Sequence, residues 1–225
     1  QDHRRFVKTH TPLDGIPRRD EVTYITVMRH PLDVALSYKD HRANSDRQRM
    51  MELRGQVGDQ RAGSETSAAP PDDPGEYLRS FVTSDSSRSA TGRYVLADLS
   101  EQAITYWEAR HAPNVHLFHY SDMWNDLESE MRQIAHALDV GVDEDRFVEF
   151  VEAASLQSMR SRAAHTAPEA HLGVWREPAQ FFKSGGTREW GSVLGVDDLA
   201  EFDRRLDELA GDAAPWIVHG RRFLQ

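Results

Sequence analysis

The stretch Val22-Thr-Tyr-Ile-Thr-Val-Met-Arg-His-Pro-Leu-Asp-Val-Ala-Leu-Ser-Tyr38 decides the fold of this chain. Its first seven residues are rich in β-branched side chains and predict a buried parallel strand. Pro31 predicts the start of a helix, because the first helical residue needs no N–H donor. Arg29 would then lie at the carboxyl end of a parallel strand, where open α/β sheets bind ligands, and Ser37 in the second turn of the next helix. A guanidinium and a hydroxyl so arranged indicate a receptor for a phosphate monoester.

A second segment, Phe6-Val-Lys-Thr-His-Thr-Pro12, has the same design. An apolar pair leads into Lys8 and His10, and Pro12 ends the run. We expect a short strand on which Lys8 and His10 point to the same side, because they are two residues apart. The segment therefore predicts a base and a cation at the end of a strand.

Composition limits the class of protein. A length of 225 residues is enough for a full core and favours a single domain over residues 1–225. The chain has no apolar run as long as a membrane span, which needs about 20 residues, and its first residues have no signal-peptide character. The net charge of −10 argues against a general nucleic-acid binder. Absence of cysteine excludes disulfides and thiolate sites, and we expect a cytoplasmic protein.

Strands and helices alternate along the chain. Residues 55–75 are rich in Gly, Ser, Ala, Pro and charged residues, which predicts a long mobile loop. The first helix is expected to continue past Tyr38 towards Arg54, and Ser100 is a candidate N-cap for a later one. A second core strand is expected at residues 114–120, and further helices at 74–83, from 143 onward and at 196–210. Such alternation implies a mainly parallel α/β sheet.

A third segment, Phe181-Phe-Lys-Ser-Gly-Gly-Thr-Arg-Glu-Trp190, places a glycine-rich loop behind two aromatic residues. Gly185 and Gly186 would let backbone N–H groups converge on an anion beside Lys183. It is not a nucleotide P-loop, because it lacks the Gly-Lys-Ser/Thr order and a preceding strand.

Taken together, these segments resemble the cytosolic-type sulfotransferases, which use 3′-phosphoadenosine 5′-phosphosulfate (PAPS) as sulfuryl donor and release 3′-phosphoadenosine 5′-phosphate (PAP). In that family a Lys-Thr-His sequence carries the catalytic histidine, and an Arg-x-Pro-x-Asp-x-x-x-Ser sequence binds the 3′-phosphate. Here those sequences stand at residues 8–10 and 29–37. The segment 181–190 resembles the family's loop that closes on the 3′-phosphate, although Lys183 replaces an arginine and Ser184 a lysine.

The resemblance implies a role for each matching residue. His10 would be the general base, and Lys8 would stabilise charge on the transferring group. The residues implied in cofactor binding are Arg29, Ser37, Tyr120, Leu156, Met159, Lys183, Ser184 and Gly185, with Tyr120, Leu156 and Met159 beside the adenine; no metal is implied. The alternatives are a surface histidine for His10, a salt bridge between Arg29 and Asp33, and ordinary core positions for the adenine residues.

The implied fold is α/β, a P-loop-NTPase-like three-layer parallel sheet flanked by helices, from which we expect the N-terminal strand and phosphosulfate loop to be missing. The implied function is transfer of a sulfuryl group from PAPS to a small-molecule hydroxyl or phenol acceptor. An impaired nucleotide-binding fragment and a nucleotide kinase are the alternatives. We expect no nucleic-acid partner and no membrane span, and the oligomeric state is left open. The acceptor should lie between the 55–75 loop and residues 165–180, where His171, Leu172, Val174 and Trp175 suggest a partly aromatic pocket.

Overall fold

The sheet is small and parallel. A computed structural model describes residues 5–56, 71–85, 94–182 and 189–224. Within these residues β1 (Tyr24–Met28) pairs in parallel with β2 (Val115–His119), in a register that sets Tyr24 opposite Val115 and Met28 opposite His119. The strands predicted around residues 22–28 and 114–120 are therefore confirmed, although in β1 only Tyr24 and Met28 are buried and Val27 is 51% exposed.

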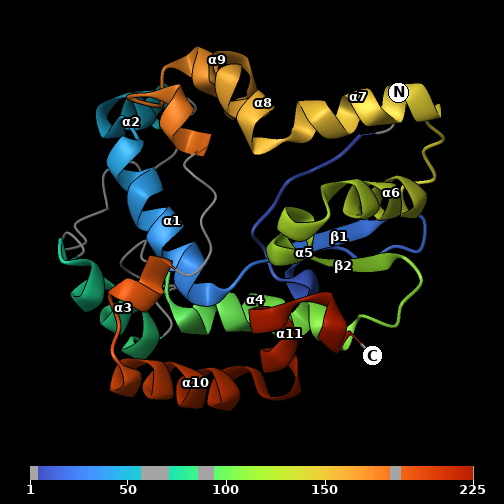
Figure 1. The fold of residues 1–225 in the computed structure, drawn as a ribbon. Helices are drawn as coiled ribbons and strands as arrows, with labels where there is room; N and C mark the ends of the chain where they lie inside the picture. Colours follow the sequence, from blue (N-terminus) through green and yellow to red (C-terminus); the bar gives the residue numbers. More distant parts are fainter. Residues whose placement is uncertain (1–4, 57–70, 86–93, 183–188, 225) are drawn as a thin grey trace.

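Helices enclose this sheet. In Figure 1 the two strands lie between the α5–α6 pair on one side and the α4–α11 pair on the other, which gives the predicted three-layer order of helices, sheet and helices. The chain is an α/β domain that is mostly helical. The described helices are α1 (Pro31–Asn44), α2 (Arg47–Gln56), α3 (Pro74–Thr83), α4 (Leu96–Glu108), α5 (Tyr120–Asn125), α6 (Leu127–Ala137), α7 (Glu144–Ala154), α8 (Leu156–Ser161), α9 (Ala163–Thr166), α10 (Val196–Ala210) and α11 (Ala214–His219).

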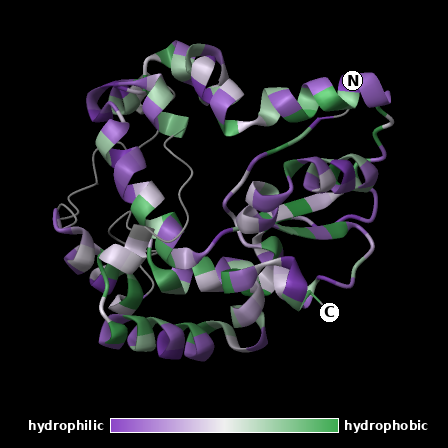
Figure 2. Ribbon diagram, viewed as in Figure 1, coloured by the Kyte–Doolittle hydropathy of each residue, from purple (hydrophilic) through white to green (hydrophobic). Residues whose placement is uncertain are grey.

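The core fixes the start of α1, and with it the end of β1. Leu32 in the first turn of α1 has no exposed surface, and neither does Trp216 of α11, whose ring stacks on Trp107 of α4 with 5.8 Å between centroids. Helix α10 covers this core with one side, as expected from its sequence; hydrophobic and hydrophilic residues alternate along it in Figure 2. The segment predicted to bind a phosphate is therefore built on an element that the core holds in place.

The first helix is shorter than the sequence predicts. It ends at Asn44, and Ser45 is extended. The N–H of Arg176 donates to the carbonyl of Asn44 (2.8 Å), and the N–H of Asp46 donates to the carbonyl of Val174 (2.8 Å). A segment distant in sequence thus takes over hydrogen bonds that a continuous helix would need, and the prediction of a helix running to residue 54 was wrong for this reason.

Ser100 is not an N-cap. Helix α4 begins at Leu96, so Ser100 lies inside the helix, where it is 1% exposed. Asp98 serves the helix start instead, because its carboxylate accepts a hydrogen bond from the N–H of Val95 (3.4 Å).

The expected strand at residues 6–12 is also absent. Residues 5–10 have no regular secondary structure, and their side chains are exposed, Phe6 at 94% and Val7 at 88%. A strand requires a partner for its N–H and C=O groups. In the described sheet β1 and β2 pair with each other, and neither pairs with this segment.

The predicted loop at residues 55–75 is described only at its ends. Residues 55 and 56 belong to α2, and Pro74 and Gly75 begin α3. The Lys39 ammonium fastens the second end to α1, because it donates to the carbonyls of Pro71 (3.3 Å) and Asp72 (2.8 Å). Residues 57–70 lie outside the described residues.

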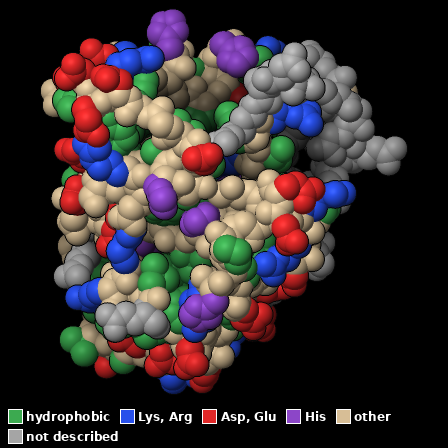
Figure 3. Space-filling model, turned by 90° about the vertical axis from the view of Figure 1, so that its right-hand side faces the viewer, with side chains coloured by type: hydrophobic (Ala, Val, Ile, Leu, Met, Phe, Trp, Pro, Cys, Tyr) green, Lys and Arg blue, Asp and Glu red, His purple; other side chains and the backbone are tan. Residues whose placement is uncertain are grey.

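The surface is mixed in charge. On the face drawn in Figure 3, basic side chains lie interspersed with acidic ones. Ion pairs match this distribution: Arg132 reaches Glu128 (2.7 Å) and Glu144 (2.8 Å). Neighbouring carboxylates therefore neutralise such arginines on the described surface.

Candidate functional site

The strand register brings together two residues that are far apart in the sequence. Met28 and His119 are opposite each other at the ends of β1 and β2, and Arg29 and Tyr120 follow them directly. The guanidinium carbon of Arg29 lies 4.4 Å from the centroid of the Tyr120 ring. At this distance the cation and the ring attract each other, so the arginine is held at the carboxyl edge of the sheet.

Helix α1 starts at this same edge, as predicted. Pro31 is its first residue, and the Nδ1 atom of His30 accepts a hydrogen bond from the N–H of Leu32 (3.3 Å). Residues three, four and seven apart share one face of a helix. One face of α1 therefore carries a row of side chains that begins beside Arg29 and lines an open cleft. That row is Asp33, Leu36, Ser37, Asp40, His41 and Asn44.

This row forms the floor of a cleft of about 710 Å³. Arg29 and Tyr120 form one end, and Leu156 and Met159 of α8 contribute to the opposite wall. Five of the residues predicted for cofactor binding therefore line one cavity. The cleft is lined by Arg29, Asp33, Leu36, Ser37, Asp40, His41, Asn44, Tyr120, Met123, Trp124, Leu127, Ala154, Leu156, Met159, Trp175, Gln180, Phe181 and Phe182.

The wall that faces α1 is held by its own small core. Leu156 and Met159 pack against the buried side chains of Ala163, Ala167 and Phe182. Leu156 and Met159 are partly buried on this cluster and line the cleft at the same time. The adenine role and the core role therefore do not exclude each other.

Hydrogen bonds attach this wall to the floor. The amide of Asn44 donates to the carbonyl of Glu177 (2.9 Å) and accepts from the N–H of the same residue (3.1 Å). The indole N–H of Trp175 donates to the carbonyl of Pro168 (2.6 Å). The Asn44 bonds thus connect the segment around Glu177 to the end of α1, and the Trp175 bond fixes the indole within the wall itself.

His41 is a cleft residue that the sequence analysis did not single out. Its ring contacts those of Trp175 and Phe181, at centroid distances of 4.6 and 5.8 Å. Partial burial, and then the positive charge of Lys8, lower the pKa of His41. The signal in the sequence was its spacing of four residues from Ser37, which places both on one helix face.

Lys8 and His10 are both exposed, and neither is among the residues that line the cleft. Their catalytic roles stay predictions.

The predicted loop residues Lys183, Ser184 and Gly185 lie outside the described residues. The residues on either side of that stretch are described. Phe182 lines the cleft, and the Trp190 ring stacks on His30 with 4.8 Å between centroids. Both described flanks therefore lie against elements of the candidate site.

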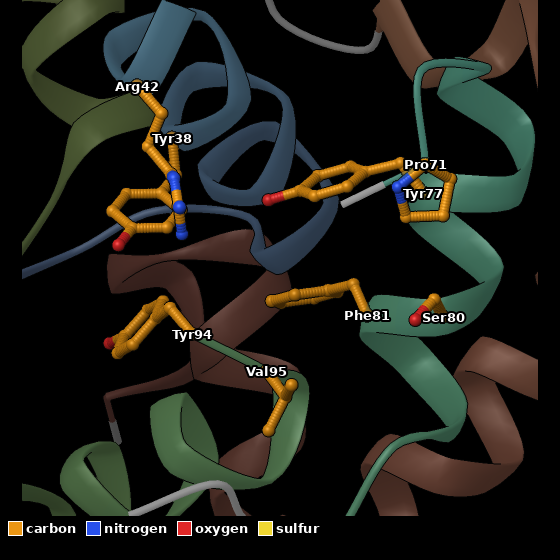
Figure 4. Close-up of a pocket in the computed structure, with 8 residues that line it drawn as sticks. All are labelled: Tyr38, Arg42, Pro71, Tyr77, Ser80, Phe81, Tyr94 and Val95. Carbon is orange, nitrogen blue, oxygen red and sulfur yellow. The ribbon is translucent and has the colours of Figure 1, made fainter. Parts of the chain in front are cut away.

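Two other pockets fit a nucleotide poorly. One lies beside Tyr38 and Arg42, where the rings of Tyr77, Phe81 and Tyr94 surround a cavity of about 20 Å³, room for a water molecule at most (Figure 4). The Tyr94 hydroxyl is packed there, and burial, followed by the charge of Asp98, raises its pKa to about 12.

The other is larger, about 960 Å³, and lies between α10, α11 and the start of α1. Its described lining includes Asp33, Asp203 and Asp207 but no lysine or arginine. These carboxylates repel a phosphate. Asp33 and Asp40 line the cleft as well, but the cleft also contains the Arg29 guanidinium, so it is the better candidate.

The four residues predicted for an acceptor pocket separate in the structure. Trp175 lines the cleft, whereas Val174 is buried at 1% exposure beneath the break after α1. His171 and Leu172 do not line the cleft; the carbonyl of Leu172 accepts a hydrogen bond from Arg49 Nε (2.8 Å).

The described residues also bear on metal ions and on membranes. No group of three or more histidine or acidic side chains among them is placed to hold a metal ion. None of the described helices combines the length and the apolar character that crossing a membrane requires.

A parallel sheet with ligand-type residues at its carboxyl edge is the arrangement of α/β nucleotide-binding domains. The family model for the sulfotransferase domain matches residues 1–214. The chain belongs to the sulfotransferase family, a family of transferase enzymes, and this identity decides against the nucleotide-kinase alternative.

Curated relatives agree with this family. A glycolipid sulfotransferase of Mycobacterium bovis and one of Mycobacterium tuberculosis are each 35% identical to the chain, over 99% of the chain and 72% of the relative. A luciferin sulfotransferase of Photinus pyralis is 25% identical, over 88% of the chain and 48% of the relative.

Solved structures share the fold. Retinol dehydratase in complex with androsterone and PAP superposes with a TM-score of 0.66 and 20% identity, over 94% of this chain and 54% of the other. Mouse sulfotransferase SULT7A1 with PAP gives a TM-score of 0.62 and 16% identity, over 93% and 67%. The chain thus spans about half the length of retinol dehydratase.

Proposed function

We propose that this chain transfers a sulfuryl group from PAPS to a hydroxyl group of a small-molecule acceptor, and that the reaction takes place in the cytoplasm. The observation that carries the proposal is the convergence of Arg29, Ser37, Tyr120, Leu156 and Met159 on one cleft. They come from the end of β1, from α1, from the start of α5 and from α8.

Arg29 and Ser37 are the proposed 3′-phosphate site. A guanidinium offers two parallel N–H donors to phosphate oxygens, and a hydroxyl donates a third hydrogen bond. The site lies beside the start of α1, where the positive end of the helix dipole also favours an anion. These hydrogen bonds and the helix dipole attract the phosphate locally, whereas the overall charge of −10 repels an anionic ligand.

Tyr120, Leu156 and Met159 are the proposed adenine site. The Tyr120 ring extends to Trp124, at 6.4 Å between centroids and 25° between planes, so a flat aromatic surface faces the aliphatic side chains of α8. A purine ring between these walls would bury both of its faces.

His10 is the proposed general base, and Lys8 the proposed stabiliser of charge on the transferring group. A histidine titrates near neutrality, so it can take the acceptor's proton as the hydroxyl oxygen attacks sulfur while the bond from sulfur to the donor phosphate breaks. Lys183, Ser184 and Gly185 are proposed to close on the 3′-phosphate. Sulfuryl transfer in this form uses no metal.

The acceptor we propose first is a sugar hydroxyl of a glycolipid. Two relatives that are 35% identical over 99% of the chain are described as glycolipid sulfotransferases. A phenol is the second candidate, because the luciferin sulfotransferase is a more distant relative and aromatic rings line the cleft.

The test is the affinity for PAP, measured by calorimetry, of the wild-type chain and of Arg29→Gln. Loss of a charge-assisted contact to phosphate costs about 1.5–3 kcal/mol, so we expect affinity to fall by about 10- to 150-fold. Arg18→Gln is the matched control, since Arg18 is exposed and does not line the cleft. Equal PAP affinity in wild type and Arg29→Gln, or preference for ATP over PAP, would overturn the proposal.

A further inference from the structure

Helix α5, which begins with Tyr120 of the proposed adenine site, has little of its own to hold it in place. It is six residues long, and none of its residues is buried. Isolated helices of this length are not stable in water, so packing and hydrogen bonds from other elements must support them. The Tyr120 ring nevertheless lies against the Arg29 guanidinium, at 4.4 Å. Contacts from outside α5 must therefore fix the start of this helix.

His119, the residue directly before α5, makes the first of these contacts. Its side chain has no exposed surface. Nδ1 accepts a hydrogen bond from the N–H of Ser121 (3.2 Å), so Nε2 carries the proton and donates to the carbonyl of Ile217 (3.1 Å). Ile217 is itself fully buried in the main core. The imidazole therefore connects the start of α5 to a fixed point on α11.

The chain that follows α11 makes the second contact. The carboxylate of Asp122, in the first turn of α5, accepts a hydrogen bond from the backbone N–H of Arg221 (2.9 Å). The Arg221 guanidinium in turn pairs with Glu130 of α6 (2.6 Å), whose side chain is only 6% exposed. Residues 217–221 are therefore bonded to α5 at two places and to α6 at a third.

Gly220 allows the chain to approach α5 this closely. Its φ is +77°, in the left-handed region that side chains other than glycine rarely adopt. A Cβ atom at this position would lie 2.6 Å from Oδ2 of Asp122 and 3.0 Å from Cβ of His119. A larger residue would thus push against both side chains that hold the start of α5.

We propose that His119 and Asp122 are positioning residues for nucleotide binding, which act through Tyr120 and are held by the 217–221 segment. This segment fixes the start of α5, so the Tyr120 ring is in place against Arg29 before the nucleotide binds. A site that is already formed loses less conformational entropy on binding. The inference rests on the proposed function, because it takes Tyr120 and Arg29 as nucleotide-binding residues. It adds His119 and Asp122, which are not among the described residues that line the cleft.

The test compares alanine substitutions at two glycines that end helices. Gly220→Ala disturbs the 217–221 segment. Gly211→Ala is the matched control, because Gly211 also has a positive φ, +48°, and ends α10, but a Cβ atom there would meet nothing within 4 Å. Both variants should lose stability through backbone strain, which thermal unfolding measures. The deciding measurement is calorimetry with PAP, at a temperature where both variants are folded.

Two substitutions of Asp122 keep the inference testable if Gly220→Ala does not fold. Asp122→Asn keeps a side-chain oxygen that can accept from the N–H of Arg221, whereas Asp122→Ala removes the acceptor. The same calorimetry with PAP is applied to both, and steady-state assays with PAPS give the KM for the donor and the KM for the acceptor.

We expect Gly220→Ala and Asp122→Ala to bind PAP about five- to tenfold more weakly than wild type, because the loss of one aromatic contact has about this effect. Gly211→Ala and Asp122→Asn should stay within about twofold of wild type. The KM for PAPS should rise in the first two variants by a similar factor while the KM for the acceptor stays unchanged. A purely structural role would not separate the two KM values.

Equal PAP affinity in Gly220→Ala and Gly211→Ala, unchanged affinity in Asp122→Ala, or a loss in Asp122→Asn as large as that in Asp122→Ala would each overturn the inference and leave the proposed function standing. Failure of the wild-type chain to bind PAP would instead remove the proposed function, and the inference with it.

Discussion

The β1–α1 segment and the N-terminal segment carry similar motifs but are packed very differently. In the first, Tyr24, Met28 and Leu32 are buried on the main core, and Arg29 projects from this rigid frame. In the second, residues 5–10 are all exposed, and Phe6 and Val7 contact no part of the core.

The difference teaches how far a motif fixes geometry. The predicted phosphate motif is placed by the core beneath it, so its geometry exists without a ligand. The segment with Lys8 and His10 lacks such support, and its catalytic geometry would have to be completed when donor and acceptor bind beside it. Chemistry follows from residue type in both segments, but preorganisation follows from packing.

The largest effect should come from the less supported segment. We predict that His10→Ala lowers kcat by about 10²–10⁴-fold, because general-base catalysis typically contributes that much. Steady-state assays with PAPS and an acceptor hydroxyl measure the change, and calorimetry should show PAP affinity within about twofold of wild type.

His111→Ala is the matched control for that variant, since His111 is exposed and outside the cleft. Turnover of His10→Ala close to that of His111→Ala would show that His10 is a surface histidine and not the base.

For the free energy of unfolding we expect the larger effect in the β1–α1 segment and the smaller effect in the N-terminal segment. Leu32 has no exposed surface, so Leu32→Ala should lower the free energy of unfolding by about 2–5 kcal/mol through lost burial and a cavity. Val7 is 88% exposed, so Val7→Ala should change the free energy of unfolding by less than about 0.5 kcal/mol.

Urea denaturation of both variants measures this contrast. A loss for Val7→Ala as large as that for Leu32→Ala would mean that the N-terminal segment packs on the core in solution.

The smallest predicted effect is a loss of stability in acid. Burial is the main cause that lowers the pKa of His119 from its ordinary value of 6.5. Its side chain has no exposed surface; Nε2 is 3.1 Å from the carbonyl of Ile217, and Nδ1 accepts from the N–H of Ser121 (3.2 Å), which fits the neutral ring. Between the folded and unfolded pKa values the unfolded chain binds more protons, so stability is complete above pH 6.5 and falls as the pH drops towards the folded value.

Unfolding measured from pH 8 to pH 5 should show this loss, and His119→Gln should flatten part of it, because glutamine keeps a donor for Ile217 but does not titrate. His41, whose pKa is lowered by partial burial and then by Lys8, contributes in the same direction. An equally steep profile in His119→Gln would exclude His119 as a source.

Much of the architecture could be predicted because its causes are local. The β-branched run before Arg29 predicts β1, Pro31 predicts the start of α1, and the helices at 74–83 and 196–210 begin and end where expected. The predictions that failed depend on distant partners. The break at Ser45 needs the 174–176 segment, and a strand at residues 6–12 would need a neighbour that the described sheet does not supply.

The candidate site likewise contains residues that the sequence predicted and residues that only the tertiary structure reveals. Arg29, Ser37, Tyr120, Leu156 and Met159 were identified through motif resemblance, and all five line one cleft. The rings of His41 and Phe181 come into contact, with 5.8 Å between centroids, only because the chain returns to α1 after residue 174. No local pattern predicts such a return, because it depends on long-range hydrogen bonds.

The sequence by itself determined the family and the two parallel strands, and it predicted the phosphate-binding motif, because strand and helix signals act over a few neighbouring residues. Only the tertiary structure decided which side chains share a cavity. The register of β1 with β2 sets Arg29 against Tyr120, and the docking of residues 174–182 on α1 closes the far wall. The strand register and the packing of residues 174–182 on α1 each depend on contacts between distant parts of the chain. They are therefore fixed only when the core forms.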